Sequence, residues 1–561
     1  MAKTDQMCLD NAACKLIARR PINLDPASKS SFDLAREWFQ TCLADHTKCP
    51  KPSLNFMPKR VISISQAHSG FSLRLLETEG LHDMYCALSY CWGGDQKTKA
   101  TKETLPQLQD GIALDKLPAT LQDAVTTTHG LGLRYLFVDS LCILQDDEED
   151  IHTQIAQMSE IYSEAAVTIL ASRANGVDFT FLHKRQSSLP SSRLRDKRYK
   201  ISLRCSGDEL GSVVVLSSYS SSKESSGPLV SRAWALQENL LSARTLDYED
   251  YHTTWRCSTI NNLTDGWLST SEFLHRVATD ETEHRDERQE LFRQWRWLVK
   301  HYARLELSYP SDKLPAISAI AGRMGSALGD KYLAGIWKSR LPQDLLWDVR
   351  QRHPRPKGFR APSWSWAAVD GDPARISTEN GSLSLEVLEC HTELKSPAAP
   401  YGAVTGGHLV VRGRLRRLVL SGIKGRIWTP FGKPTATKVK LANLFHVVEP
   451  GCKGSEAWMP MNFDAVEQEF QDNAVMDIAM LEVYEHESGP CYGLVLRPVG
   501  PQRFSRLGVF GYLYGPEDLD QGSSPGSDTG GELEGVEEWE PLYENWLQGF
   551  GECDFTTVTL V

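Results

Sequence analysis

Three short stretches of the sequence combine polar, aromatic and glycine residues in patterns suited to ligand binding or proton transfer. The first reads LSYCWGG and covers residues 88–94. Its Ser89 and Tyr90 supply hydroxyl groups, and Trp92 supplies a face for stacking. Gly93 permits the close approach of a backbone or a ligand. We predict ligand contacts here, although a tight turn around a core aromatic ring would need the same residues.

The second stretch, DSLCILQ, begins at Asp139. Asp139, Cys142 and Gln145 are three residues apart and share one face if the chain is helical here. A carboxylate beside a thiol suits acid–base or nucleophilic chemistry. The nearest histidines, His129 and His152, lie outside the motif, so no base is at hand to activate the thiol. We therefore predict an acid–base role for Asp139, and ligand contacts rather than nucleophilic attack for Cys142 and Gln145.

The third stretch, RAWALQE, begins at Arg232 and opens a predicted helix that continues to Arg244. The guanidinium of Arg232 can clamp a phosphate or carboxylate. Glu238 can act as a general base or hold a ribose hydroxyl. Trp234 and Gln237 are predicted to contact the same ligand. The alternative is a helix anchored by Trp234, with Arg232 and Glu238 forming a surface ion pair of little energetic value.

A fourth pattern, Cys42-x3-His46-x2-Cys49, contains three residue types that bind zinc. It lacks the paired CxxC spacing of common zinc sites, and the sequence shows no clear fourth ligand. We therefore predict no metal site. The sequence also contains no P-loop, no GxGxxG after a strand, no HExxH and no GxSxG.

Composition limits the kinds of partner. The chain has 61 Lys and Arg against 72 Asp and Glu, a net charge of −11, and nine of the acids lie in residues 516–540. A net anion is poorly suited to coat nucleic acid, so we expect no nucleic-acid partner. No apolar run approaches the ~20 residues of a membrane span. The 13 scattered cysteines are typical of a reducing compartment, which predicts a cytoplasmic location.

The three stretches follow predicted elements of an α/β domain over residues 61–250. Short apolar runs alternate with helical patterns, and the strands are continuously apolar, which favours a mainly parallel sheet covered on both faces. The predicted strands are CALSY (86–90), YLFVD (135–139) and AVTILA (166–171), and the predicted helices cover 118–129 and 150–162. Ligands bind such sheets at the carboxyl ends of the strands, where the first two stretches lie.

Three further regions flank this predicted domain. Residues 1–60 form a leader with one helix over 32–49. Residues 251–353 are predicted to be helical, with helices over 292–302, 313–328 and 332–346. Residues 354–561 read as a β-rich region of antiparallel strands, interrupted by an acidic disordered loop at 516–540.

In order and spacing, these motifs resemble the fungal heterokaryon-incompatibility (HET) domain. The matching residues lie within YCALSYCWG (85–93), LPAT (117–120), YLFVDSLCILQD (135–146), MSEIYSEA (158–165) and RAWALQENLLSAR (232–244). The chain looks like a stand-alone member, without an appended NACHT, ankyrin or WD-repeat region. The resemblance implies a role in allorecognition and fungal innate immunity, as an effector of programmed cell death when unlike hyphae fuse.

HET domains are also distantly similar to Toll/interleukin-1 receptor (TIR) domains, some of which cleave NAD. This similarity implies a TIR-like, flavodoxin-like doubly wound sheet with NAD as a substrate, and no further cofactor. The NAD-cleaving TIR enzymes use a glutamate on the helix after a central strand, for which residues 150–162 are the counterpart. Where many family members carry an acid, this chain has Gln154, so hydrolysis would need Glu149, Glu160 or Glu238 instead. Asp139 and Glu238 are the predicted catalytic residues.

Three functions remain open from the sequence. The chain can be a cell-death effector with NAD glycohydrolase-like activity. It can instead be a non-catalytic module that self-associates as a homo-oligomer or binds a protein partner such as the product of an incompatible allele. The third alternative is an enzyme of specialised metabolism on the same scaffold.

Overall fold

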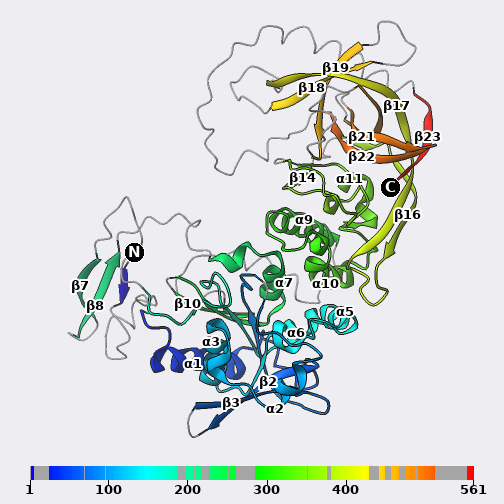
Figure 1. Cartoon of the computed structure of the whole chain (residues 1–561). Helices are drawn as coiled ribbons and strands as arrows, with labels where there is room; N and C mark the ends of the chain where they lie inside the picture. The colour runs from blue at the N-terminus through cyan, green and yellow to red at the C-terminus, as the bar shows by residue number, and fades with distance from the viewer. Residues whose placement is uncertain are drawn as a thin grey trace. The chain divides into compact units, whose positions relative to one another are not determined.

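The computed structural model of the chain is shown in Figure 1. It describes residues 2–4, 24–67, 70–94, 96–185, 198–205, 209–216, 227–250, 252–260, 285–349, 352–375, 381–428, 441–448, 456–465, 475–486, 491–511 and 553–561. The predicted acidic loop at 516–540 lies outside these residues. The chain forms two compact units, Met1–Glu281 and Thr282–Val561.

The first unit is built on a seven-stranded sheet. The strands, in spatial order, are β10 (Thr253–Cys257), β9 (Arg244–Tyr248), β6 (Val167–Leu170), β4 (Cys86–Ser89), β5 (Tyr135–Phe137), β2 (Arg60–Ala67) and β3 (Gly70–Glu77). The four strands β9, β6, β4 and β5 are parallel. Both edges are antiparallel, because β2–β3 and β9–β10 are hairpins with short connections. The expectation of a mainly parallel sheet is thus confirmed for the four central strands and wrong for the sheet as a whole, which is mixed.

The order of the parallel strands creates a switch point. Along the sheet they run β5, β4, β6, β9, which is second, first, third and fourth in chain order. The crossover from β4 to β5 therefore runs toward one edge of the sheet, and the crossover from β6 to β9 runs toward the other. Such a point is where doubly wound sheets bind their ligands, at the carboxyl ends of the strands.

Helices cover both faces of this sheet (Figure 1). They are α1 (Lys29–Asp45), α2 (Leu105–Asp110), α3 (Ala119–Gly130), α4 (Asp139–Cys142), α5 (Glu148–Ala156), α6 (Met158–Glu164) and α7 (Ala233–Leu241). Because crossovers between parallel strands are right-handed, we expect α3 on one face and α5, α6 and α7 on the other. Accordingly, α1 packs on α3, whereas α7 packs on α6, β4 and β6.

Three predicted helices have different bounds in the structure. The predicted helix over 150–162 is two helices, because the backbone leaves the helical region at Gln157. The helix after Arg232 ends at Leu241, since Arg244 already begins β9. The leader helix ends at Asp45, ahead of the predicted Cys49.

The centre of the sheet is an apolar core. Every residue of β4, β5 and β6 is buried, as expected for strands covered on both faces. Beside this core, the first unit contains a small antiparallel sheet of β1 (Ala2–Thr4), β8 (Leu210–Leu216) and β7 (Arg198–Arg204).

The second unit begins with helices and short hairpins. Its elements are α9 (Arg285–Tyr302), α10 (Ser318–Leu328), β11 (Tyr332–Leu333), β12 (Ile336–Trp337), α11 (Leu341–Asp344), β13 (Trp347–Val349) and β14 (Pro373–Arg375). The predicted helix over 332–346 is wrong. Ala334 and Gly335 adopt positive φ angles and turn the chain into the β11–β12 hairpin.

Beyond β14, the described strands of the second unit form a nine-stranded sheet. Its strands are β15 (Gly381–Leu383), β16 (Glu386–Leu394), β17 (Val404–Trp428), β18 (Leu441–Val448), β19 (Glu456–Phe463), β20 (Met476–His486), β21 (Cys491–Gly500), β22 (Arg503–Phe510) and β23 (Phe555–Leu560). Their pairings are antiparallel except that of β22 with β23, so the predicted antiparallel region is confirmed.

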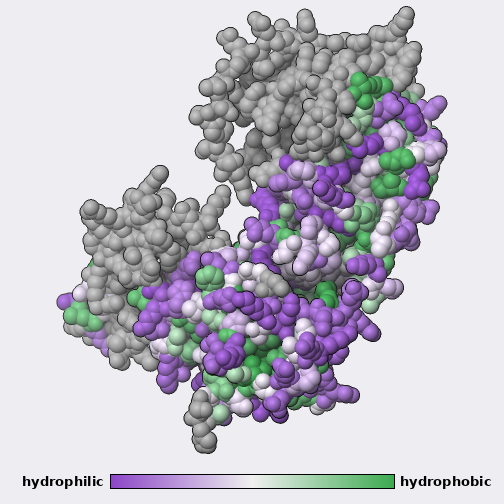
Figure 2. Space-filling model, in the orientation of Figure 1, coloured by the Kyte–Doolittle hydropathy of each residue, from purple (hydrophilic) through white to green (hydrophobic). Residues whose placement is uncertain are grey.

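Hydrophilic side chains cover most of the described surface on the face shown in Figure 2. Among the helices that the structure describes, none is both long and apolar enough to cross a membrane.

Candidate functional site

The carboxyl end of β4 and helix α7 meet in a buried contact between Ser89 and Glu238. Because α7 packs on β4 and β6, the side chain of Glu238 reaches the last residue of β4. The Ser89 hydroxyl donates a hydrogen bond to Oε2 of Glu238. Ser89 is fully buried and Glu238 is only 8% exposed. The structure thus joins the first and third predicted stretches at the switch point of the sheet.

Burial changes the acidity of Glu238. Desolvation raises its pKa to about 7, against the hydrogen bond from Ser89 and the positive charge of Arg232, which lower it. The nearby carboxylate of Asp139 raises the pKa further, and a hydrogen bond with Tyr162 lowers it. An acid with a pKa near neutrality can both donate and accept a proton, and perturbed groups of this kind are concentrated at functional sites.

Asp139 is the first residue of α4, which follows β5. Trp92 of the first stretch holds its carboxylate in place. The indole Nε1 of Trp92 donates to Oδ2 of Asp139 at 2.9 Å, and the backbone N–H of Ser140 donates to Oδ1 at 2.7 Å. Burial raises the pKa of Asp139, and these two hydrogen bonds oppose the rise. The Tyr90 hydroxyl donates to Oγ of Ser140 at 2.9 Å. The second stretch therefore joins the cluster through both Asp139 and Ser140.

Arg232 places a positive charge beside these carboxyl groups. It immediately precedes α7, and its Nη1 donates to the backbone oxygen of Tyr90 at 2.5 Å. Its charge lowers the pKa of both Asp139 and Glu238. Among the described residues, no carboxylate lies within ion-pair distance of Arg232, so the alternative of a simple surface pair with Glu238 is not what forms. A half-buried guanidinium in this position suits an anionic ligand.

Gly93 lies where the loop after β4 contacts the loop after β6. Its φ angle is +74°, and a Cβ added there would lie 2.8 Å from the Cα atom of Gly176 in the loop after β6. The backbone N–H of Val177 donates to the oxygen of Trp92 at 3.3 Å. The close approach expected at Gly93 is thus an approach of the chain to itself, and it fixes the loop that carries Trp92.

Asp139 and Cys142 both lie in helix α4, but Gln145 does not share their helical face. The helix ends at Cys142 and the chain is extended at Ile143, so the expectation of one shared face is wrong for Gln145. Cys142 is fully buried, its sulfur accepts from the N–H of Val138, and burial raises the pKa of its thiol to about 12, which disfavours nucleophilic attack. The amide of Gln145 donates to the backbone oxygens of Asp139 and Ile143, which braces the loop.

The two remaining predicted contacts lie on α7. Trp234 is half-buried, and Gln237 is 1% exposed. Oε1 of Gln237 is buried without a hydrogen-bond partner among the described residues. The residues brought together around Glu238 by contacts or charge are Ser89, Tyr90, Trp92, Asp139 and Arg232. Cys142 lies outside this strand-end cluster.

One further buried acid near the same end of the sheet was not among the predicted site residues. Asp247 lies in β9, in register with Leu170 of β6. Burial raises its pKa to about 7, against a hydrogen bond with Ser172 and the charges of Arg256 and Arg185. No local signal singled out Asp247, because its strand RTLDY also contains the polar residues Arg244 and Thr245.

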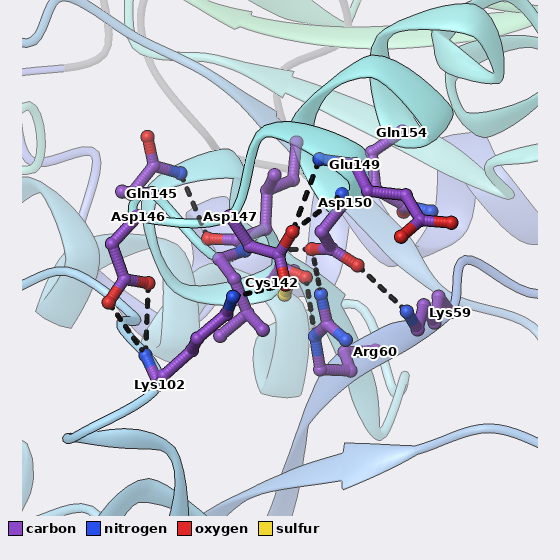
Figure 3. A network of polar contacts seen from close by, with 12 residues as sticks. Lys59, Arg60, Lys102, Cys142, Gln145, Asp146, Asp147, Glu149, Asp150 and Gln154 are labelled. Atoms are coloured by element: carbon purple, nitrogen blue, oxygen red, sulfur yellow. Dashed lines mark hydrogen bonds and ion pairs between the residues drawn. The ribbon is translucent and has the colours of Figure 1, made fainter.

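A second buried acid, Asp150, belongs to a saturated network on the other side of β5 (Figure 3). Its carboxylate contacts the guanidinium of Arg60, the ammonium of Lys59 at 2.8 Å and the N–H of Leu144 at 2.9 Å. Burial alone would raise the pKa of Asp150, but these partners together lower it. Arg60 also donates to the backbone oxygen of Cys142 at 2.9 Å. This network joins β2 to α5 and is structural.

Many family members are expected to carry an acid at the position of Gln154. Glu149, Glu160 and Glu238 were the predicted replacements, and the structure separates them by burial. Gln154 is 1% exposed, and its amide donates to Oε1 of Gln157 at 3.2 Å. Glu149 and Glu160 are both exposed. Glu238 is the one of the three candidates that is buried and in contact with the strand-end cluster.

Comparison with known families identifies one domain of this chain. Residues 85–238 match the family model described as heterokaryon incompatibility protein (HET). No curated protein and no solved structure matches the chain. The matched segment begins just before β4, ends at Glu238 and contains every residue of the strand-end cluster. The chain therefore carries a HET domain over residues 85–238.

Proposed function

We propose that this chain is an effector of heterokaryon incompatibility whose strand-end cluster binds a nucleotide, NAD, and cleaves its glycosidic bond. The HET domain supports a role in heterokaryon incompatibility. The observation that carries the enzymatic part is the Ser89–Glu238 contact at the switch point. There a buried glutamate with a pKa of about 7 lies near a second carboxyl group and an arginine.

The residues of the cluster divide into binding and chemical roles. Arg232 holds the pyrophosphate, and the indole of Trp92 stacks on a ring of the nucleotide. Trp234 and Gln237, on the same helix as Glu238, contact the remainder of the ligand. Asp139, oriented by its hydrogen bond from Trp92, accepts hydrogen bonds from the ribose hydroxyls.

Cleavage of the glycosidic bond does not require the protein to supply a proton to the leaving group. The bond between ribose C1′ and the nicotinamide nitrogen breaks, and its electron pair neutralises the pyridinium, so nicotinamide leaves without needing a proton. The carboxylate of Asp139 stabilises the oxocarbenium-like ribose. Glu238, in its ionised form, takes a proton from the water that adds to C1′. The rate should therefore rise with pH as Glu238 loses its proton around pH 7.

The enzymatic part is tested with the purified full chain and NAD. We expect nicotinamide release that increases between pH 6 and pH 8, as the pKa near 7 requires. Glu238→Gln should lower the rate by roughly 100-fold or more. Glu160→Gln makes the same chemical change on an exposed helix position and should leave the rate unchanged. No release at high protein concentration would refute the hydrolysis.

Expression in a fungal host tests the effector role. Growth arrest by the unaltered chain, and growth after Glu238→Gln or Asp139→Asn, would support an effector that acts through the cluster. Arrest that persists in both folded variants would favour a HET domain that signals by binding a partner or a second copy of itself.

A further inference from the structure

Four residues that bind metals meet in the first unit, away from the strand-end cluster. They are Cys42, His46, Cys49 and Cys257, and one ligand atom from each lies within 4.8 Å of all the others. Cys42, Cys49 and Cys257 are buried, and His46 is half-buried. The fourth ligand that the sequence analysis did not find is Cys257, more than 200 residues from its partners.

Two elements deliver these four ligands. Cys42 lies in the last turn of α1, His46 is the residue that caps it, and Cys49 follows in the next loop. Cys257 is the last residue of β10. Helix α1 packs on β10, and the ring of Phe39 lies 6.3 Å from that of Trp255. The end of the helix at Asp45 therefore turns the chain back toward the edge of the sheet.

The spacing of the ligand atoms fits a tetrahedral ion. With Zn–S near 2.3 Å and Zn–N near 2.05 Å, the edge between a sulfur and a nitrogen ligand is about 3.6 Å. The Nδ1 atom of His46 lies 3.7 Å from Sγ of Cys49 and 3.4 Å from Sγ of Cys257. A disulfide would use two of the sulfurs and leave the third thiol and the imidazole without a role.

The charge around the cluster agrees with the same ion. Arg244 is buried, and its Nε donates to Sγ of Cys42 at 3.2 Å, while Nη2 donates to the backbone oxygen of Pro50. Within the described part of the chain, no carboxylate lies within ion-pair distance of this guanidinium. A buried arginine requires a negative partner. Zn²⁺ with three thiolates and one neutral imidazole carries a net charge of −1, which Arg244 would neutralise.

A hydroxyl group also lies against one of the sulfur atoms. The Oγ1 atom of Thr259 lies 3.4 Å from Sγ of Cys49. Such hydrogen bonds around metal ligands orient them and tune the site.

We propose that Cys42, His46, Cys49 and Cys257 bind one structural Zn²⁺ ion, which fastens helix α1 to the β9–β10 hairpin of the HET-domain unit. All four coordination positions are filled by the protein, as in structural rather than catalytic zinc sites. Arg244, which pairs with Cys257 across the hairpin, acts as a positioning residue for the Cys42 sulfur. The site does not depend on the proposed NAD chemistry.

Metal analysis of the purified full-length chain, expressed with zinc in the medium, tests the proposal. We expect one zinc per chain by elemental analysis. Substitution with Co²⁺ should give the intense visible bands of a tetrahedral, thiolate-rich site. Fewer than about 0.2 metal ions per chain, or an octahedral cobalt spectrum, would overturn the proposal.

Variants separate ligand loss from misfolding. Cys257→Ser should lose the zinc, and Arg244→Gln should weaken zinc binding by roughly 10- to 100-fold. Cys142→Ala removes an equally buried thiol outside the cluster, so it controls for the cost of altering the core, and it should retain one zinc. If Cys257→Ser does not fold, chelation of the unaltered chain gives the same information, because removal of a structural ion should lower its Tm.

A disulfide is the competing outcome. Thiol titration and mass analysis of the denatured chain without reductant should find the three cluster cysteines reduced. A Cys42–Cys257 or Cys49–Cys257 disulfide in the metal-free native chain would refute the zinc site.

Discussion

Asp150 and Glu238 are both buried carboxylic acids on helices of the first unit, α5 and α7, yet their surroundings are opposite. Asp150 is 4% exposed and contacts two cations and a backbone N–H, and its pKa is lowered. Glu238 is 8% exposed and accepts a hydrogen bond from the neutral hydroxyl of Ser89, and its pKa is raised to about 7.

The difference separates a structural acid from a functional one. A buried charge that is fully paired stabilises one arrangement of β2 and α5 and has no capacity left for a ligand. A buried acid that is under-paired costs stability, and such a cost is common where a group must exchange a proton or bind a substrate. The comparison therefore predicts opposite effects on stability when each acid is neutralised.

The largest effect on stability is expected in the network around Asp150, whose carboxylate is fully paired. Asp150→Asn would leave the guanidinium of Arg60 buried without its anion. We expect the free energy of unfolding to fall by about 3–5 kcal/mol. Chemical denaturation followed by tryptophan fluorescence would measure the loss. A loss below about 1 kcal/mol would contradict the structural role of this pair.

Neutralising Glu238 should instead stabilise the fold at high pH. Because the folded-state pKa lies above the unfolded value of 4.5, the folded chain keeps a proton over pH 4.5 to about 7 that the unfolded chain has lost. Stability therefore falls as pH rises through this window, by about 3 kcal/mol in total. Glu238→Gln should remove this fall.

Thermal unfolding at pH 5 and pH 8 measures this difference. The Tm of Glu238→Gln should match that of the unaltered chain at pH 5 and exceed it at pH 8. Glu160→Gln, an exposed position, should follow the unaltered chain at both pH values. Equal Tm differences at the two pH values would show that Glu238 does not titrate in this window.

A smaller effect is expected at the contact between Trp92 and Asp139. Trp92→Phe keeps the aromatic ring but removes the N–H that donates to Oδ2 of Asp139 at 2.9 Å. We expect a loss of about 1.5–3 kcal/mol, typical of a hydrogen bond to a charged group. A double-mutant cycle with Asp139→Asn measures the coupling, and additive effects would show that the two side chains are independent.

The smallest effect is expected at the exposed arm of the Asp150 network. The Lys59 side chain is 52% exposed, so its ion pair with Asp150 is screened by solvent. Lys59→Ala should cost about 0–1 kcal/mol, measured by the same denaturation experiment. If Lys59→Ala lowered the free energy of unfolding as much as Asp150→Asn does, burial would not determine how strongly the ion pairs of Asp150 stabilise the fold.

Much of the α/β core could be predicted because its signals are local. Continuous apolar runs predicted the three central strands, and the structure has strands at Cys86–Ser89, Tyr135–Phe137 and Val167–Leu170. The predicted helix over 118–129 is found as Ala119–Gly130. Element ends were less predictable, because tertiary contacts decide whether a segment such as 242–248 continues a helix or begins an edge strand.

The candidate site was predictable in its residue types but not in its contacts. Strand-end positions identified Ser89 and Asp139, and the third stretch identified Glu238. Nothing in the local sequence indicated that Glu238 would contact Ser89, 149 residues earlier. The local sequence likewise did not indicate that Arg60 would pair with Asp150, or that Cys257 would approach His46. Each depends on strand order, which a single sequence does not specify.

A direct titration of Glu238 tests the central claim, that this acid is buried and under-paired at the strand ends. The carboxyl ¹³C resonance of Glu238, assigned by its absence from Glu238→Gln, can be followed in the full chain from pH 4 to pH 9. We expect a titration midpoint near 7. A midpoint near 4.5, the ordinary value for glutamate, would contradict it.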